Sequence, residues 1–290
     1  MPQLALLATT IVWGATFPAT KAALAQLPPL SFLFIRFLLG ALLAVAAAWA
    51  MGYRLERNSA VLRMAAIATV WLSLGYLCQT VGLHYTTASN SAFITVLYVV
   101  FVPIFLRRFT LVTWIAVGLA LTGLFCLVKP TLSINLGDLL NLACAAAFAA
   151  HIACLEQFTR TGQSVSLFLW QMILMSFVMA LGSVSESPGV EAFRPSPVLL
   201  TGLTVTGVLA TGAFAVQMWA QRVVPAHQVA LIFALEPACA AWLSSLFLGE
   251  EFDRLGWVGS GCILIATLLG TLRGRESDSM KESAAGLPTK

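Results

Sequence analysis

The chain has 290 residues, of which 59% are hydrophobic and only 10% are charged, and its formal net charge is +4. Soluble domains carry about 25% charged residues. A water-soluble fold is therefore excluded, and lipid is the expected solvent for most of the chain. The apolar stretches are long and continuous rather than alternating, so we expect helices and not a β-barrel to satisfy the backbone in the bilayer.

Apolar runs bounded by charged residues, Gly, Pro and polar clusters predict ten transmembrane helices. In chain order they cover 3–26, 30–51, 62–84, 88–106, 110–128, 137–158, 164–185, 199–220, 226–248 and 255–272. The first run has no basic region before it and exceeds the about 7–15 apolar residues of a signal peptide, so we interpret it as a helix. The fold class predicted is an all-α membrane protein.

The distribution of lysine and arginine predicts that both termini are cytoplasmic. With the N-terminus inside, eleven of the sixteen basic residues fall on the inner side and four on the outer side, while Arg36 lies within a helix. The tail 273–290 is polar and rich in serine and charge, so we predict a disordered cytoplasmic segment there.

An internal repeat relates 88–97 (ASNSAFITVL) to 226–235 (AHQVALIFAL), and four of these positions are identical at a spacing of 138. Farther along the two copies, Arg107-Arg108 aligns with Glu250-Glu251. The pair predicted on the inner side of the membrane is basic, and the equivalent pair predicted on the outer side is acidic. Each copy contains five predicted helices, an odd number, which places the second copy upside down. We therefore predict two inverted repeats, 1–128 and 137–272, an arrangement that recurs in secondary transporters.

Several short elements together resemble the EamA-type members of the drug/metabolite transporter superfamily. They are Ile11–Phe17 (IVWGATF) with Lys21 and Pro28-Pro29, Arg36-Phe37, Tyr85–Ala88 (YTTA), and Leu235-Glu236-Pro237 followed by Leu248-Gly249-Glu250. The chain departs from the family pattern in the fourth helix, where Val99 matches Pro237 and Pro103 comes later. The resemblance covers 1–272 and implies ten helices, cytoplasmic termini, the bacterial inner membrane, and export of amino acids, other metabolites or drugs.

Glu236 is the foremost candidate for a functional residue because it lies near the middle of an apolar segment. An ionised carboxylate costs at least about 2.5 kcal/mol at the centre of a membrane helix, and such residues usually face a cavity and bind ions, protons or substrate. The alternative is a hydrogen-bonded glutamate that stabilises a kink at Pro237. In the functional interpretation, Glu236 exchanges a proton for the substrate.

Six other residues are candidates for binding or coupling: Trp13, Arg36, Gln79, Asn90, His151 and Gln217. Arg36 could extend its charge to the interface, receive a substrate carboxylate or pair with Glu236. Gln79 matches Gln217 in the repeat, which suits a polar cavity at the midplane, although interhelical hydrogen bonding would also explain these amides.

His151 could relay protons or be a hydrogen-bonded interior residue, and Trp13 could stack on an aromatic substrate or pack between helices. We expect the first, third, fourth, sixth, eighth and ninth segments to line the cavity, and the fifth and tenth to be peripheral.

These patterns predict a secondary transporter, and the family resemblance implies that it exports amino acids or related small metabolites or drugs. The alternatives are an uptake permease for a small metabolite and a membrane receptor or scaffold without transport. An enzyme is not expected because the chain has no HExxH, no paired membrane aspartates and no glycine-rich nucleotide loop. No cofactor, metal site or nucleic-acid partner is predicted, since none of the six cysteines has metal-ligand spacing. The expected partners are a small-molecule substrate, protons and the lipid bilayer.

Overall fold

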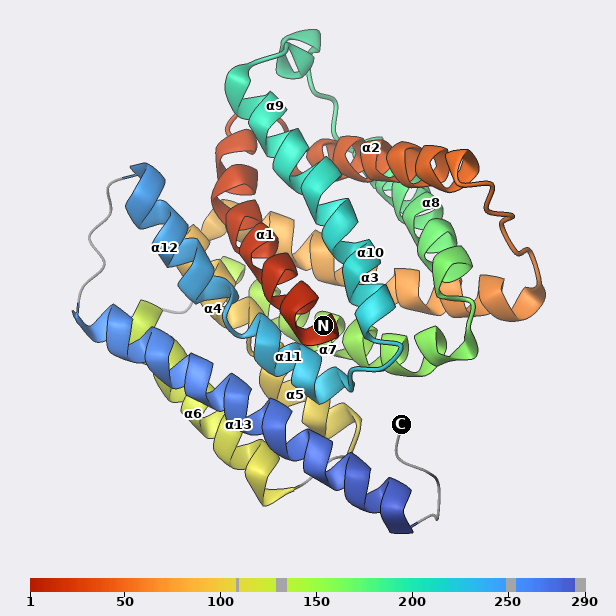
Figure 1. Ribbon diagram of the computed structural model, residues 1–290. Helices are drawn as coiled ribbons and strands as arrows, with labels where there is room; N and C mark the ends of the chain where they lie inside the picture. Colours follow the sequence, from red (N-terminus) through yellow and green to blue (C-terminus); the bar gives the residue numbers. More distant parts are fainter. Residues whose placement is uncertain (108–109, 129–134, 249–253, 285–290) are drawn as a thin grey trace.

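The computed structural model describes residues 1–107, 110–128, 135–248 and 254–284, and within them every regular element is helical (Figure 1). The elements are α1 (Pro2–Ala23), α2 (Pro29–Ala50), α3 (Ser59–Tyr85), α4 (Ala88–Thr95), α5 (Tyr98–Phe105), α6 (Leu111–Val128), α7 (Leu136–Phe158), η1 (Thr159–Thr161), α8 (Ser164–Ser183), η2 (Val190–Phe193), α9 (Pro197–Leu203), η3 (Thr204–Leu209), α10 (Ala210–Ala220), α11 (Ala226–Phe233), α12 (Glu236–Leu248) and α13 (Arg254–Ala284).

The prediction of an all-α protein is confirmed, and each of the ten predicted segments contains a helix. Five stretches are long and apolar enough to cross a membrane by length and composition, namely Pro29–Ala50, Ser59–Tyr85, Leu136–Thr161, Ser164–Ser183 and Pro197–Ala220. Four shorter apolar helices accompany them: Asn90–Phe105, Leu111–Cys126, Ala226–Ala240 and Arg254–Leu269. The number of membrane crossings stays a prediction.

Several helices begin at a polar residue whose side chain satisfies an otherwise unpaired backbone N–H. Asn58 accepts a hydrogen bond from the N–H of Val61, and Thr87 does the same for Asn90. Asn135 forms a reciprocal capping box with Asp138 at the start of α7. These caps explain why the helices begin within a few residues of the predicted boundaries.

Three segments differ from the single helices that the sequence predicts. The fourth and ninth segments are each divided into two short helices, α4–α5 and α11–α12, and the eighth contains the π-helical turn η3. The last helix, α13, does not end at Leu272 but continues to Ala284, through much of the predicted disordered tail. The chain has no proline between Leu272 and Pro288, and polar composition alone does not end this helix.

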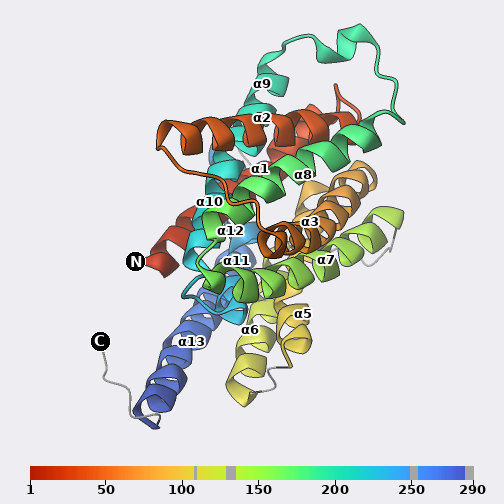
Figure 2. The same ribbon diagram turned by 90° about the vertical axis from the view of Figure 1, so that its right-hand side faces the viewer.

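The helices pack in pairs around a central group (Figures 1 and 2). The first peripheral pair is α2 and α8, and the second is α6 and α13. Between these pairs, α1 packs against α10 and α12, and α3 packs against α7. In Figure 2 the N-terminus and the end of α13 lie towards the same side.

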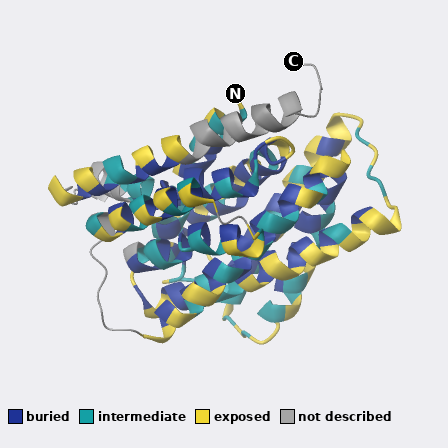
Figure 3. Cartoon of the chain, turned by 90° about the horizontal axis from the view of Figure 1, so that it is seen from below, coloured by how far each residue is buried: buried dark blue, intermediate teal, exposed yellow. Residues whose placement is uncertain are grey.

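Exposed side chains lie on the periphery, and many of them are large and apolar (Figure 3). Trp49 is 82% exposed, for example, although it belongs to an apolar helix. The interior contains polar side chains instead, among them Arg36, His151 and Gln217. This distribution fits a protein surrounded by lipid, because lipid contacts apolar surface and buried polar groups must find partners inside.

The helices α6 and α13 pack closely at Gly123. A Cβ at this position would lie 2.5 Å from the carbonyl oxygen of Gly259, so only glycine allows α6 to approach α13 this closely. At Gly118 and Gly261, by contrast, such a Cβ would meet no atom of the described residues within 4 Å. Close packing therefore does not require glycine at these two positions.

Gly75 of α3 makes room for the ring of Phe148 on α7. A Cβ at Gly75 would lie 2.2 Å from Cε1 of Phe148 and 2.3 Å from its Cδ1. We expect Gly75→Ala to lower the free energy of unfolding by about 1–2 kcal/mol relative to Gly118→Ala, because overpacking displaces the ring. Gly118→Ala is the matched control, since both variants gain the same helix propensity but only one is crowded. Equal melting midpoints of the two purified variants in detergent would contradict this packing.

Candidate functional site

The site forms where two helices are interrupted. The α-helical hydrogen bonding is interrupted at Val96–Leu97 between α4 and α5, and at Ala234–Leu235 between α11 and α12, although Val96, Leu97 and Ala234 keep right-handed helical torsion angles. Both breaks contain hydrogen bonds that span three residues rather than four, such as Leu97 N–H to the Ile94 carbonyl and Leu235 N–H to the Ile232 carbonyl. The two interruptions are 138 residues apart, the spacing of the sequence repeat.

Glu236 is the first residue of α12, and this position depends on Pro237. Proline has no N–H and is favoured in the first turn of a helix, so it begins α12 rather than bending a continuous helix. The segment predicted as one helix is thus two helices, which meet just before Pro237. The carboxyl group lies at the N-terminus of α12, where the helix dipole favours negative charge.

Tyr98, the first residue of α5, donates a hydrogen bond from Oη to Oε2 of Glu236 over 3.1 Å. The two side chains thus connect the two broken helices, and both are buried, with Glu236 only 5% exposed. Tyr98 and Glu236 also occupy corresponding positions of the repeat, since their numbers differ by 138. This repeat spacing is the sequence signal that relates Tyr98 to Glu236, and Tyr98 was not among the seven predicted binding or coupling residues.

A cavity lies beside this hydrogen bond and contains about 470 Å³ of empty space, counting the space at its opening. Its lining residues are Trp13, Thr16, Phe17, Leu72, Tyr76, Gln79, Thr95, Tyr98, Phe148, His151, Ile152, Phe214, Gln217, Phe233 and Glu236. They belong to α1, α3, α4, α5, α7, α10, α11 and α12, which are the helices of the six segments predicted to contribute. Among the residues whose side chains the structure describes, neither α6 nor α13 supplies a lining residue. Of these residues, Glu236 is the one with a carboxyl group.

Aromatic rings form much of the cavity wall. The ring centroid of Trp13 lies 4.6 Å from that of Phe233 and 5.2 Å from that of Phe214. Tyr76 continues the series, with its centroid 6.2 Å from Phe214 and 5.2 Å from Phe148. We call these five residues the aromatic wall. Aromatic side chains suit an apolar body or an organic cation.

Polar side chains complete the cavity from two sides. Gln217 donates from Nε2 to Oε1 of Gln221 over 2.8 Å, and Gln221 donates from Nε2 to the Ile152 carbonyl over 2.9 Å. His151 Nε2 lies 2.7 Å from Nε2 of Gln171. His151 is therefore a buried, hydrogen-bonded residue that also lines the cavity, which fits both of its predicted interpretations.

Gln79 connects the cavity to a second polar network between α3, α4 and α7. Its Nε2 lies 3.4 Å from Oγ1 of Thr95, which in turn lies 3.4 Å from Oδ1 of Asn141. Ser91 donates to the same Asn141 oxygen over 2.7 Å. Asn141 was not among the predicted site residues, although it is a fully buried amide within an apolar segment.

Two predicted site residues do not line the cavity. Asn90 lies in the first turn of α4, where its backbone N–H bonds to Oγ1 of Thr87. Arg36 is buried, and its guanidinium lies 4.6 Å from the ring centroid of Tyr76 and 4.9 Å from that of Phe37. Arg36 is only 3% exposed, and among the described residues no ion pair joins it to Glu236. Tyr76 both lines the cavity and contacts this cation.

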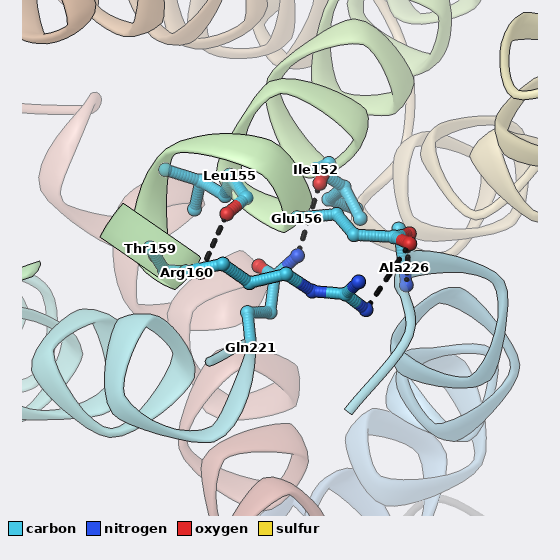
Figure 4. Close-up of polar contacts among 7 residues, drawn as sticks. All are labelled: Ile152, Leu155, Glu156, Thr159, Arg160, Gln221 and Ala226. Carbon is cyan, nitrogen blue, oxygen red and sulfur yellow. Dashed lines mark hydrogen bonds and ion pairs between the residues drawn. The ribbon is translucent and has the colours of Figure 1, made fainter. Parts of the chain in front are cut away.

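The connection between α10 and α11 is held against the end of α7 by a buried carboxylate (Figure 4). Oε2 of Glu156 accepts a hydrogen bond from the N–H of Ala226 over 2.8 Å, and Oε1 lies 3.4 Å from Nη2 of Arg160. The Gln221 bond to Ile152 lies in the same region.

Lys21, in the last turn of α1, makes a separate polar contact. It donates from Nζ to the carbonyls of Leu83 and Thr86, over 2.5 and 2.9 Å, and so caps the end of α3.

Comparison with known proteins finds one family over nearly the whole chain. The model of the EamA-like transporter family matches residues 1–129 and 135–272. An uncharacterized transporter of Archaeoglobus fulgidus is 30% identical over 284 residues, which cover 93% of this chain and 86% of that relative. The uncharacterized inner membrane transporter YedA of Escherichia coli is 26% identical over 92% of this chain and 90% of its own length.

A relative in Bacillus subtilis, the uncharacterized transporter YvbV, is 26% identical over 97% of this chain and 93% of its own length. Among the solved structures that match, one crystal structure has a TM-score of 0.76 and 16% sequence identity, covering 95% of this chain and 98% of that one. At this identity the match shows the fold alone.

Proposed function

Since the chain belongs to the EamA-like transporter family and is a multi-pass membrane transporter, we propose that it is a secondary transporter exporting amino acids or related small metabolites or drugs across the bacterial inner membrane. The observation that carries this proposal is the cavity at the two helix breaks, lined by the aromatic wall and one carboxyl group. Binding sites of transporters commonly lie at the midplane where broken helices meet.

Glu236 is the proposed coupling residue. Its Oε2 is bonded to Tyr98, while the carboxyl group as a whole faces the cavity, where a proton or a substrate ammonium can reach it. The two occupants compete for one carboxyl group, so binding of substrate on one side releases a proton there. His151, Gln79, Gln217 and Trp13 are proposed to contact the substrate, and Arg36 is proposed to orient Tyr76 from behind.

We further propose ten crossings arranged as two inverted repeats, 1–128 and 137–272. Three observations support this arrangement. The two helix breaks are separated by the spacing of the sequence repeat, and a hydrogen bond joins the corresponding residues Tyr98 and Glu236. The N-terminus and the end of α13 also lie towards one side (Figure 2). Of the basic and acidic pairs that suggested inversion, Arg108, Glu250 and Glu251 lie outside the described residues.

The arrangement predicts cytoplasmic termini. Reporter fusions after Arg57 and Arg160 are expected to be active as cytoplasmic reporters, and a fusion after Pro195 as a periplasmic one, because the basic residues concentrate on the side shared by Arg57 and Arg160. Alkaline phosphatase and green fluorescent protein fusions give opposite signals and check each site twice. Arg160 follows the sixth predicted helix, which is the first helix of the second half. A periplasmic signal there would contradict an odd number of crossings in the first half.

The transport function itself is tested by efflux from cells. Cells with and without the gene are loaded with a panel of radiolabelled amino acids and metabolites, and efflux is measured at two external pH values. The proposal predicts at least one solute whose efflux depends on both the gene and the external pH. A panel of this breadth with no gene-dependent efflux or uptake would instead favour a receptor or scaffold.

A further inference from the structure

Two polar atoms at the cavity have no partner among the residues that the structure describes. One is Oε1 of Gln217 and the other is Nε1 of Trp13, and both are buried. Gln217 is 1% exposed, and both residues line the cavity. A buried polar atom without a hydrogen bond is costly, so such atoms at a cavity mark the positions where a bound molecule forms its polar contacts.

The orientation of the Gln217 amide follows from its neighbours. The Ile152 carbonyl can only accept, so the group of Gln221 that contacts it must be the NH₂, as Figure 4 shows. The oxygen of Gln221 is then directed to Gln217, which must donate to it with its own NH₂. A reversed Gln217 amide would place two acceptor oxygens together. Gln217 is therefore held with its acceptor oxygen available to the cavity.

Glu236 adds a second acceptor to the same cavity. Its Oε2 is occupied by Tyr98, and the carboxylate can accept further bonds. No lysine or arginine is among the described residues that line the cavity, and Arg36 contacts Tyr76 without lining the cavity itself. The polar groups therefore favour a molecule with several donors and a positive charge. An ammonium has three donors and no acceptor, which matches this set.

The aromatic wall completes the match. Its ring faces attract a cation through their quadrupoles and also bury an apolar body. The indole N–H of Trp13 offers one donor to an acceptor elsewhere on the ligand. Of the two lining atoms without a partner, only the indole N–H of Trp13 could donate to an anion, and an ionised Glu236 would repel it.

We propose that the cavity selects a protonated primary amine with an aromatic or apolar body, and that Gln221 sets this preference as a positioning residue. Gln221 is not a lining residue, and it acts by fixing the acceptor oxygen of Gln217. The proposal rests on the transport site proposed above and names the class of substrate for it.

The test measures binding to the purified full-length protein in detergent with three probes of one shape: 2-phenylethylamine, 2-phenylethanol and phenylacetate. The amine is expected to bind at least about tenfold more tightly than the alcohol, since hydrogen bonds to charged groups are the stronger class, and phenylacetate is expected to bind more weakly than both. Phenylacetate binding as tightly as the amine would overturn the proposal.

Gln221→Leu removes the bond that orients Gln217 and leaves the cavity-lining side chains unchanged. We expect the amine-to-alcohol preference to fall by about tenfold, because the Gln217 amide can then turn its NH₂ towards the cavity. Gln228→Leu is the control: Gln228 is a buried glutamine of α11 outside the cavity lining, and the preference should stay at the wild-type value. An unchanged preference in Gln221→Leu would contradict the positioning role.

Gln217→Met gives the same test from inside the cavity, and it serves where Gln221→Leu does not yield folded protein. It keeps the length of the side chain and removes the acceptor, so the preference for the amine should fall by a similar factor. Flux of phenylacetate that depends on Glu236 would overturn the substrate class while supporting transport. Selective binding of the amine with no gene-dependent flux of any solute would contradict the transport function and support the specificity.

Discussion

Glu236→Gln is expected to reduce solute transport by about 10- to 100-fold and to remove its dependence on pH. The factor corresponds to losing the about 1.5–3 kcal/mol of a hydrogen bond to a charged group. The substitution keeps the shape of the side chain and an oxygen that can accept from Tyr98 Oη, but it can neither bind nor release a proton. Membrane insertion and folding should be normal, because the change removes an ionisable group from the membrane.

The matched control is Glu156→Gln, the same change at a buried carboxylate outside the cavity lining. It should retain the pH dependence of the wild-type protein. Transport by Glu236→Gln at the wild-type rate with the wild-type pH profile would show that the carboxyl group is structural and that coupling lies elsewhere.

Glu156→Leu is expected to have the largest effect on stability, a loss of about 2–4 kcal/mol in the free energy of unfolding. Leucine leaves the buried N–H of Ala226 without its acceptor, which costs about 1–3 kcal/mol. It also removes the negative charge at the N-terminus of α11, worth about 0.3–1 kcal/mol or more when partly buried. Arg160 is half-exposed, so the loss of its ion pair adds little.

The measurement is the melting midpoint of the purified variant in detergent, beside Glu156→Gln and Glu191→Leu. Glu156→Gln keeps an oxygen for Ala226 and should lose only a part of the stability. Glu191 forms an exposed ion pair with Arg194, and its replacement should be nearly neutral. A Glu156→Leu midpoint equal to that of Glu191→Leu would mean that the contact with Ala226 contributes nothing measurable.

The positions of the helices were predictable because charged and polar residues bound each apolar run. The interruption at Val96–Leu97 was not, since no proline marks it and a continuous apolar run has no local sign of a break. Pro237 was read as a bend within one helix, whereas it begins a second one. The extension of α13 was missed because helix-forming polar residues also occur in disordered tails.

The site was predictable in its composition but only partly in its contacts. Glu236, Gln79, Gln217, His151 and Trp13 all line the cavity because polar or large aromatic residues within apolar segments tend to face the interior. The hydrogen-bond partner of Glu236 was not predicted, because tyrosine is common in membrane helices. Tyr98 and Glu236 occupy corresponding repeat positions, but their side chains differ, so comparing the two copies for identical residues does not reveal the pair. Arg36 could not be placed, because depth along a helix does not fix the direction of the side chain.

The most direct test of the central claim, that Glu236 exchanges a proton for the transported solute, is a proton count in liposomes. The purified protein is reconstituted with a pH-sensitive dye inside, and solute flux and proton flux are measured together. Because one carboxyl group lines the cavity, about one proton should move per solute in the opposite direction, and Glu236→Gln should remove the proton flux. Solute flux without proton movement, or proton movement that persists in Glu236→Gln, would contradict the claim.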